Sequence, residues 1–137
     1  MKISRKVEYA SRVLAQLART HGSQKMPHIE ELADIEKVPA NYLVQILNEL
    51  RNAGLIVSRR GKQGGYMLSR APAEITIADI VRAIDGELLE CSTEVAGESG
   101  KGVYAVLTAV ARDFQASAEN HSLRDILGAE SSQMYFI

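Results

Sequence analysis

The chain has 137 residues, of which 46% are hydrophobic, so it can form one ordinary domain or a small domain with an appendage. A single cysteine excludes an internal disulfide and a zinc site of several cysteines. The chain has neither an apolar run of roughly 18 residues nor a signal-peptide stretch, which predicts a cytoplasmic protein with no membrane partner. The net charge of −1 hides a basic part, residues 1–70, at +6 and an acidic remainder at −7, which favours a polyanionic partner for the basic part.

Three helical segments are predicted in the basic part. The first follows Ser4 with apolar residues at helical spacing and stops at Gly22, and the second begins near Pro27. The third, KVPANYLVQILNELRNAG, has Pro39 near its start and Gly54 just past its end. Its predicted buried stripe consists of Leu43, Ile46, Leu47 and Leu50. The opposite face carries Asn41, Gln45, Asn48 and Arg51.

The next segment predicts a β-hairpin. Two β-prone runs, LIVSRR and YMLS, flank the turn GKQGG, in which we expect Gly64 and Gly65 to supply positive φ angles. The turn is not a nucleotide-binding P-loop, because Lys62 precedes the glycine pair and no Ser or Thr directly follows that lysine. Arg59, Arg60 and Lys62 would repel one another there, so contact with a nucleic-acid backbone is a better interpretation than a plain turn.

The acidic part begins with a connector, residues 71–74, and a short helix. Thr76 and Asp79 resemble a capping box, and Gly86 ends this helix. Residues 87–102 lack periodicity and predict a loop. An amphipathic helix of about four turns is expected next, followed by a short helix, LRDIL, capped by Ser122. The apolar side of the amphipathic helix consists of Val103, Val106, Leu107, Val110 and Phe114, and its other side is rich in alanine.

Three helices followed by a hairpin predict a winged helix-turn-helix, which is a mainly α fold with a small β-hairpin. In this fold the third helix faces a DNA groove and the hairpin contacts the DNA backbone. We therefore expect two parts: a winged helix-turn-helix DNA-binding domain over residues 1–72, and a part over residues 73–137 with a linker, a regulatory loop and the last helices.

The polar face of the third helix carries the candidate base contacts. The amides of Asn41 and Gln45 could bond to adenine and Arg51 could reach a phosphate; alternatively, this face is simply solvated. No arrangement typical of catalysis is present, so we do not expect an enzyme. The scattered histidines are His21, His28 and His121.

Three segments, MKISRKVEYA, YLVQILNELRNAGLI and RRGKQGGYML, together resemble the Rrf-two family of winged-helix transcriptional regulators, and the similarity runs over nearly the whole chain. The most specific mark is the wing Arg-Gly-x-x-Gly-Gly-Tyr. The resemblance implies a homodimer that binds a palindromic double-stranded DNA operator, with residues 103–114 as the dimerisation helix. Val44 stands where the family often has glutamate, so a carboxylate that could accept from cytosine is missing. The predicted DNA-contacting residues are Lys2, Arg5, Asn41, Tyr42, Gln45, Arg51, Arg59, Arg60, Lys62, Gln63, Gly64, Gly65 and Tyr66.

The predicted loop departs from the iron–sulfur members of the family, which by this resemblance carry three cysteines there. This chain has only Cys91, at a position like the first of the three, and Glu8 falls where some members place a carboxylate ligand from the partner subunit. One cysteine and one glutamate cannot supply four ligands, so we expect no iron–sulfur cluster, no other cofactor and no metal. Cys91 is then either a thiol switch or a residue without a regulatory role.

The chain ends in QMYFI, which resembles the ending of the CymR-like branch of the family, the branch without the three cysteines. The resemblance implies that the tail, with Tyr135, Phe136 and Ile137, binds cysteine synthase, whose active site can capture a terminal carboxylate. The alternative is that the tail packs on its own dimer. We predict a homodimeric transcriptional repressor, with cysteine or sulfur metabolism as its target. The alternatives are a redox or iron–sulfur sensor of the same family and a protein-interaction module that has lost DNA binding.

Overall fold

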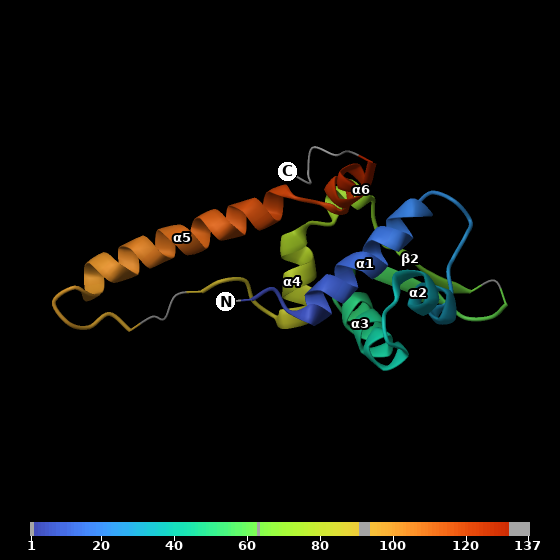
Figure 1. Cartoon of the computed structure of the whole chain (residues 1–137), viewed down its shortest axis with the longest axis horizontal. Helices are drawn as coiled ribbons and strands as arrows, with labels where there is room; N and C mark the ends of the chain where they lie inside the picture. Colours follow the sequence, from blue (N-terminus) through green and yellow to red (C-terminus); the bar gives the residue numbers. More distant parts are fainter. Residues whose placement is uncertain (1, 63, 91–93, 132–137) are drawn as a thin grey trace.

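The computed structural model of the chain describes residues 2–62, 64–90 and 94–131 (Figure 1). Strands β1 (Ile56–Arg59) and β2 (Gly65–Leu68) form an antiparallel hairpin that follows the third helix. The helices are α1 (Arg5–Arg19), α2 (Ile29–Glu36), α3 (Ala40–Asn52), α4 (Ile77–Asp85), α5 (Gly100–Asn120) and α6 (Leu123–Ser131), with a 3-10 turn, η1, over Pro72–Glu74. The predicted fold class, a mainly α winged helix-turn-helix with a small hairpin and a long helix near the C-terminus, is confirmed.

The helix ends follow local signals in the sequence. The Ser4 hydroxyl accepts a backbone hydrogen bond of 3.1 Å from the first turn of α1 and so caps it. At α4, Thr76 and Asp79 exchange side-chain-to-backbone bonds of 3.1 and 2.9 Å, so the predicted capping box is confirmed. Between α2 and α3, Lys37 takes a left-handed φ of 55°, and Pro39 directly precedes α3. This tight turn makes α2 and α3 a helix-turn-helix.

Helix α5 is longer than the sequence predicted. It runs over 21 residues, about six turns, instead of about four turns from Val103 to Phe114. The added C-terminal residues, QASAEN, show no hydrophobic periodicity that would predict a helix. They contain neither Gly nor Pro, so their intrinsic helix propensity allows the helix to continue. At the other end the predicted loop stops at Ser99, whose carbonyl accepts the Val103 amide at 3.0 Å.

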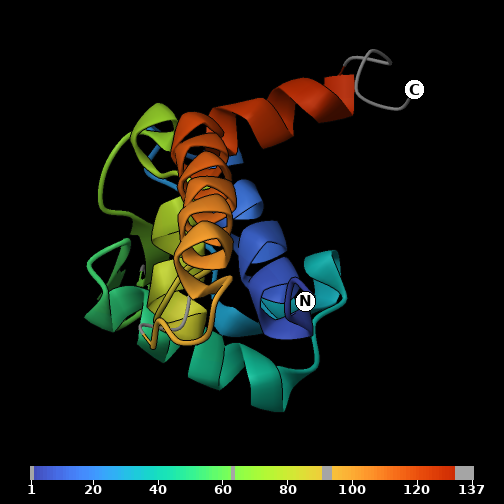
Figure 2. The same ribbon diagram turned by 90° about the vertical axis from the view of Figure 1, so that its left-hand side faces the viewer.

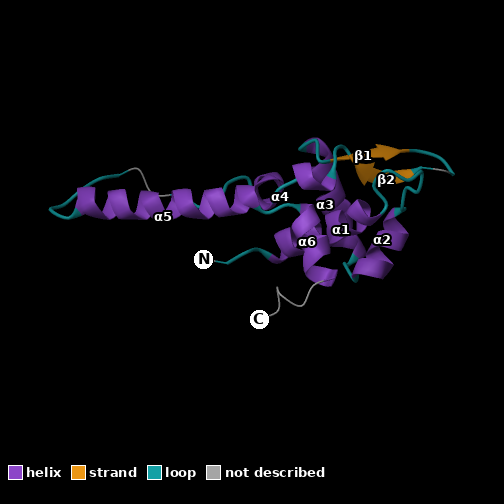
Figure 3. Ribbon diagram, turned by 90° about the horizontal axis from the view of Figure 1, so that it is seen from above, coloured by secondary structure: helices purple, strands orange, loops and turns teal. Residues whose placement is uncertain are grey.

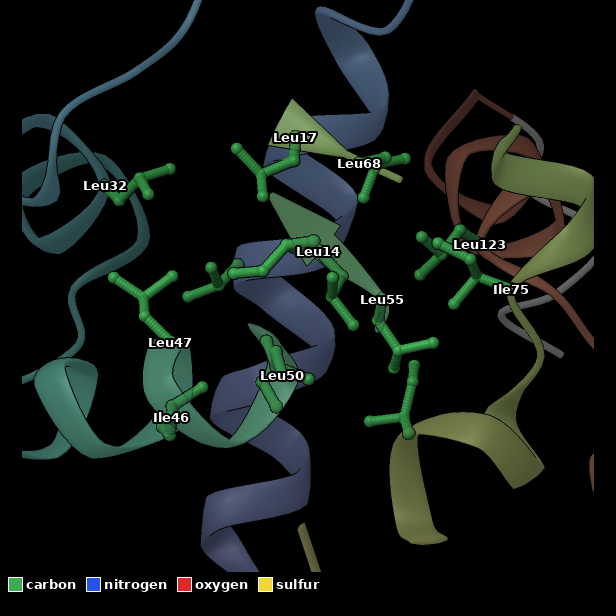
Figure 4. Close-up of a cluster of buried hydrophobic side chains, with 14 of the residues drawn as sticks. Leu14, Leu17, Leu32, Ile46, Leu47, Leu50, Leu55, Leu68, Ile75 and Leu123 are labelled. Carbon is green, nitrogen blue, oxygen red and sulfur yellow. The ribbon is translucent and has the colours of Figure 1, made fainter. Parts of the chain in front are cut away.

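One hydrophobic core joins the N-terminal helices, the hairpin and the region of α4 and α6 (Figure 4). The predicted apolar stripe of α3 is buried in it, together with Leu14 and Leu17 of α1. Ile75 and Leu123 lie side by side in this core, and the Leu123 amide donates to the Ile75 carbonyl at 3.0 Å. Residues on both sides of the predicted boundary at residue 72 therefore share one core, while the division into two functional parts stays a prediction.

Helix α5 leaves this core and extends away from it (Figures 1 and 3). In the view along its axis it stands in front of the body that the other helices form (Figure 2). Ala118 is the one residue of α5 that is fully buried, so nearly the whole helix is open to solvent in the single chain. Within residues 2–62, 64–90 and 94–131, no helix combines the length and the apolarity that crossing a membrane requires.

Candidate nucleic-acid interface

The outer face of α3 is polar and exposed. It presents the predicted contacts Asn41, Tyr42, Gln45 and Arg51 to solvent, together with Asn48, while the apolar stripe points into the core. Arg51 donates to Asn48 Oδ1 at 3.0 Å, so a guanidinium lies against an amide at the end of this face. Amides can bond to base edges and a guanidinium can bind a phosphate, so this face has the groups that base and backbone contacts require.

The hairpin forms a wing that extends beyond the helices (Figure 3). Its strands pair over four residues each and end with Arg59 opposite Gly65. Gly61, the first glycine of the wing motif, takes a positive φ of 101° in the turn, although the sequence predicted a positive φ only for Gly64 and Gly65. The exposed cations of the wing are Arg59, Arg60 and Lys62. These three positive charges therefore lie at the end of a short β-hairpin that extends away from the helices.

Gly65 at the start of β2 allows the wing to lie directly against the segment before α2, whereas Gly64 allows the turn to approach β1. Gly65 has a φ of 144°, as predicted, whereas the positive φ expected of Gly64 is not found. A Cβ on Gly65 would lie 2.2 Å from the Met26 carbonyl oxygen. A Cβ on Gly64 would come equally close to the backbone of β1. The Tyr66 amide donates to the Pro27 carbonyl at 3.0 Å. Only a residue without a side chain at position 65 can approach this segment so closely, and the hydrogen bond then fixes the wing relative to the helices.

Comparison with known proteins places this arrangement in a family. The family model of Rrf2 (Rrf-two), described as an iron-dependent transcriptional regulator, matches residues 3–129. The chain belongs to the Rrf2 family. A relative from Mycobacterium tuberculosis, whose name describes an HTH-type transcriptional regulator, is 39% identical over 133 residues, which cover 93% of this chain and 82% of the relative. The chain is therefore a DNA-binding transcriptional regulator and not an enzyme, and the predicted family is confirmed.

Solved structures with Rrf2-type folds resemble the chain over almost its whole length. CymR (YrzC), the global cysteine regulator of B. subtilis, has a TM-score of 0.77 and 30% identity over 94% of this chain and 98% of that chain. IscR of T. potens has a TM-score of 0.75 and 32% identity over 98% of this chain and 92% of that chain. The similarity thus extends beyond the winged helix to the later helices of the Rrf2 regulator.

The Rrf2 family description implies iron, but the donor set of this chain does not fit an iron–sulfur cluster with four protein ligands. Such clusters are held mainly by cysteine thiolates, and the sequence contains one cysteine. The carboxylate of Glu8, the second candidate ligand, already accepts from Arg12 through both oxygens at 2.8 to 3.0 Å. A cluster would therefore have at most one thiolate from this chain, and its use of Glu8 would have to displace an existing ion pair.

A hollow of about 820 Å³ lies between the wing of this Rrf2 regulator and the segment before α2. The wing cations line one side of it. The other side is lined by Ser23, Gln24, His28 and Glu31. These four residues precede or begin α2 and carried no functional signal in the sequence, because only the folded wing brings them beside the cations. The three wing cations and the polar side chains of Ser23, Gln24 and His28 suit a DNA backbone segment, whereas the Glu31 carboxylate on the α2 side would repel a phosphate.

Two side-chain contacts with helix α1 hold α3 in position. Lys6 pairs with Glu49 at 2.6 Å, and the Tyr9 and Tyr42 rings pack edge to face with centroids 5.8 Å apart. The Tyr9–Tyr42 contact holds the first turn of α3, where Tyr42 remains partly exposed. Exposed at the start of α1 are two further predicted DNA contacts, Lys2 and Arg5.

Arg12 ties α1 to the helix-turn-helix. Its guanidinium donates to the Glu36 carbonyl at the end of α2 at 2.8 Å and lies 5.1 Å from the ring centroid of Tyr9. Hydrogen bonds to Glu8 raise the pKa of Arg12 above its ordinary value, so its charge is held firmly. Burial raises the pKa of the neighbouring Glu36 carboxyl. Arg12 therefore joins the start of α1, the end of α2 and, through Tyr9, the start of α3.

We expect Arg12→Met to weaken operator binding about fivefold, because α3 loses one of the contacts that hold it in position. This loss is roughly the contribution of one partly exposed charged contact. The slope of log K against log salt should stay unchanged, because Arg12 bonds within the protein and not to phosphate. Anisotropy titrations at several salt concentrations measure both quantities. Arg124→Met is the matched control, since it removes the same charge from an exposed position on α6. A smaller slope for Arg12→Met would mean that Arg12 contacts DNA.

The apolar stripe predicted on α5 is exposed in the single chain. All five residues of the stripe, from Val103 to Phe114, are open to solvent along the extended helix. Phe114 also lines a groove of about 440 Å³ between α4, the segment after it and the N-terminal residues. The stripe thus continues into a groove whose apolar lining includes Ile3, Val81, Leu88 and Leu89. Monomeric proteins rarely expose a continuous apolar surface of this kind, so this surface is the candidate for a protein–protein contact.

Five predicted site residues lie outside the residues that the structure describes. They are Gln63, Cys91, Tyr135, Phe136 and Ile137. Their roles in the wing, as a sensor and in the C-terminal tail therefore stay predictions.

Proposed function

We propose that the chain is a homodimeric transcriptional repressor that acts in the cytoplasm and binds a palindromic operator through two winged helices. The main support is that the exposed amide face of α3 and the cationic wing are both anchored to one core. The Tyr66–Pro27 hydrogen bond holds the wing, and the Tyr9–Tyr42 contact holds α3. In a winged helix-turn-helix, the recognition helix enters the major groove while the wing reaches the adjacent backbone.

In this proposal, the amide side chains contact bases and the cationic side chains contact phosphates. The amides of Asn41 and Gln45 contact base edges, because they can donate and accept at once. The cations bind phosphates and supply the affinity that does not depend on sequence. The phosphate-binding residues are Lys2, Arg5, Arg51, Arg59, Arg60 and Lys62.

The dimer in the proposal is supported by the exposed apolar stripe of α5. Two α5 helices that pack through this stripe place two α3 helices on one DNA molecule, where half-sites lie about 34 Å apart, or one turn of the double helix. A signal that changes how the two α5 helices pack would change this spacing, and the operator would be released. The similarity to CymR supports cysteine or sulfur metabolism as the regulated process. Binding of cysteine synthase by the tail and oxidation of Cys91 are the predicted inputs.

Arg60→Ala tests the wing. We expect the affinity for operator DNA to fall about fivefold to tenfold, and the slope of log K against log salt to fall by about one, because one phosphate contact is lost. Mobility-shift titrations with the DNA upstream of the regulator's own gene measure both. Arg124→Ala is the matched control, since it removes the same charge from an exposed position on α6.

The outcomes separate two classes of protein. An affinity and a slope that do not change in Arg60→Ala would remove the wing from the interface. If the wild-type protein binds no DNA even at low salt, the chain is instead a protein-interaction module that has kept the fold and lost DNA binding.

A further inference from the structure

Helix α3 carries one branched aliphatic side chain on its exposed side. Val44 is 48% exposed, whereas the branched aliphatic residues of the buried stripe are almost completely buried. Val44 lies one helical turn from Asn41 and Asn48 and next to Gln45, so polar groups surround it. A β-branched residue at a half-exposed helix position lowers helix propensity relative to alanine, and Val44 is not part of the hydrophobic core that could offset this cost. The stability of the fold therefore does not explain a valine here.

Val44 also points away from the contacts that hold α3 in the protein. Tyr42, two residues earlier, lies on the opposite flank of the helix, where it packs against Tyr9 of α1. Val44 instead shares the exposed side with Asn41 and Gln45 in the first turns of α3. In helix-turn-helix proteins, residues in the first turns of the recognition helix reach the base edges.

We propose that Val44 contacts the C5 methyl group of a thymine in the major groove and so determines specificity at one base pair of each half-site. This inference rests on the proposed DNA-binding role of α3. The thymine methyl is the apolar group that a base edge presents in the major groove, and apolar side chains contact it. Val44 offers neither donor nor acceptor, so a cytosine at this position would leave its amino group without a partner.

The shape of valine fits this role. Its χ1 angle is nearly fixed in a helix, so its two methyl groups are presented to the groove with little loss of side-chain entropy on binding. The neighbouring amides of Asn41 and Gln45 can set the register by bonding to adjacent bases. Val44 then distinguishes bases by an apolar contact between two hydrogen-bonding neighbours.

Deoxyuridine provides the test, because it differs from thymidine only by the C5 methyl group. An operator is obtained by in vitro selection with the wild-type protein, and each thymidine is then replaced in turn, symmetrically in both half-sites. We expect one symmetric replacement to weaken wild-type binding about fifteenfold, which is about fourfold for each methyl group lost from an apolar contact. Val44→Ala has a shorter apolar side chain and is expected to lose most of the preference for the thymidine version of that operator over the deoxyuridine version.

Two further variants make the result specific. Val95→Ala makes the same change at a valine that is 45% exposed, outside the winged helix, and should keep the full preference for the methyl group. Val44→Ile keeps a branched apolar side chain and should keep the preference as well. If the wild type selects an operator but Val44→Ala is as sensitive to deoxyuridine as the wild type, the inference is overturned and the DNA-binding role stands. If the wild type selects no DNA, the inference and the proposed function fall together.

Discussion

Replacing Val106 and Val110 together by glutamate is expected to convert the proposed dimer into a monomer and to lower its affinity for a palindromic operator about a hundredfold. The two side chains are 63% and 52% exposed and lie one turn apart on the apolar stripe of α5. In a symmetric dimer, the new carboxylates would be desolvated against an apolar surface and would face like charges. A monomer also loses the high effective concentration that binding of one winged helix gives to the other.

Sedimentation velocity measures the oligomeric state of this variant, and anisotropy titrations measure its affinity. Its circular dichroism spectrum should match that of the wild type, because neither valine belongs to the core. The matched control combines Ala105→Glu with Ala109→Glu, which adds the same charges on the alanine-rich side of α5. We expect the control to remain a dimer. A monomeric control beside a dimeric valine variant would move the interface to the alanine-rich side.

The features of the fold that sequence could predict are those whose causes are local. Ser4, Pro39 and the pair of Thr76 and Asp79 each act within one turn of the helix end that they mark, so their effect can be read from neighbouring residues. The exposed side of α3 follows from the helical period in the same way. Its candidate base contacts could therefore be named before the tertiary structure was known.

Contacts between distant segments could not be predicted, because they depend on how the elements pack. Arg12 bonds to the carbonyl of Glu36, 24 residues away, and nothing near either residue indicates this pair. The hollow beside the wing likewise combines the cationic turn with His28 and its neighbours from a much earlier segment. The full length of α5 was missed because its last six residues, QASAEN, show no apolar periodicity. The ion pair between Arg82 and Glu119, which joins these last turns to α4, depends on how the two helices pack.

Helix α1 links the DNA-facing elements to the rest of the protein. At its start the Ser4 hydroxyl donates to Asp85 of α4 at 3.2 Å, and at its end Arg19 pairs with Glu130 of α6. Between these points Arg12 and Tyr9 hold the helix-turn-helix. A change in the packing of α4 or α6 against α1 would therefore reach α3 through contacts that already exist. This connection supports the proposal that rearrangement of the later helices controls operator binding.

Gly65→Ala is expected to loosen the wing and to lower the free energy of unfolding by about 3 kcal/mol. The added methyl group would lie 2.2 Å from the carbonyl oxygen of Met26 and 2.6 Å from that of Pro27, and the φ of 144° disfavours any side chain. Strand β2 must then move away from the segment before α2, which breaks the hydrogen bond from the Tyr66 amide to Pro27. Affinity for the operator should fall about tenfold, because the wing cations lose their fixed position.

Gly61→Ala separates the steric contact from the backbone strain. Gly61 also has a positive φ, of 101°, but a Cβ at this position meets nothing within 4 Å. We expect this control to lower the free energy of unfolding by about 1 kcal/mol and to leave the Tyr66 amide protected from hydrogen exchange. In Gly65→Ala the same amide should exchange rapidly. Equal losses of stability in the two variants, with Tyr66 protected in both, would mean that the wing does not depend on the Met26–Pro27 segment for its position.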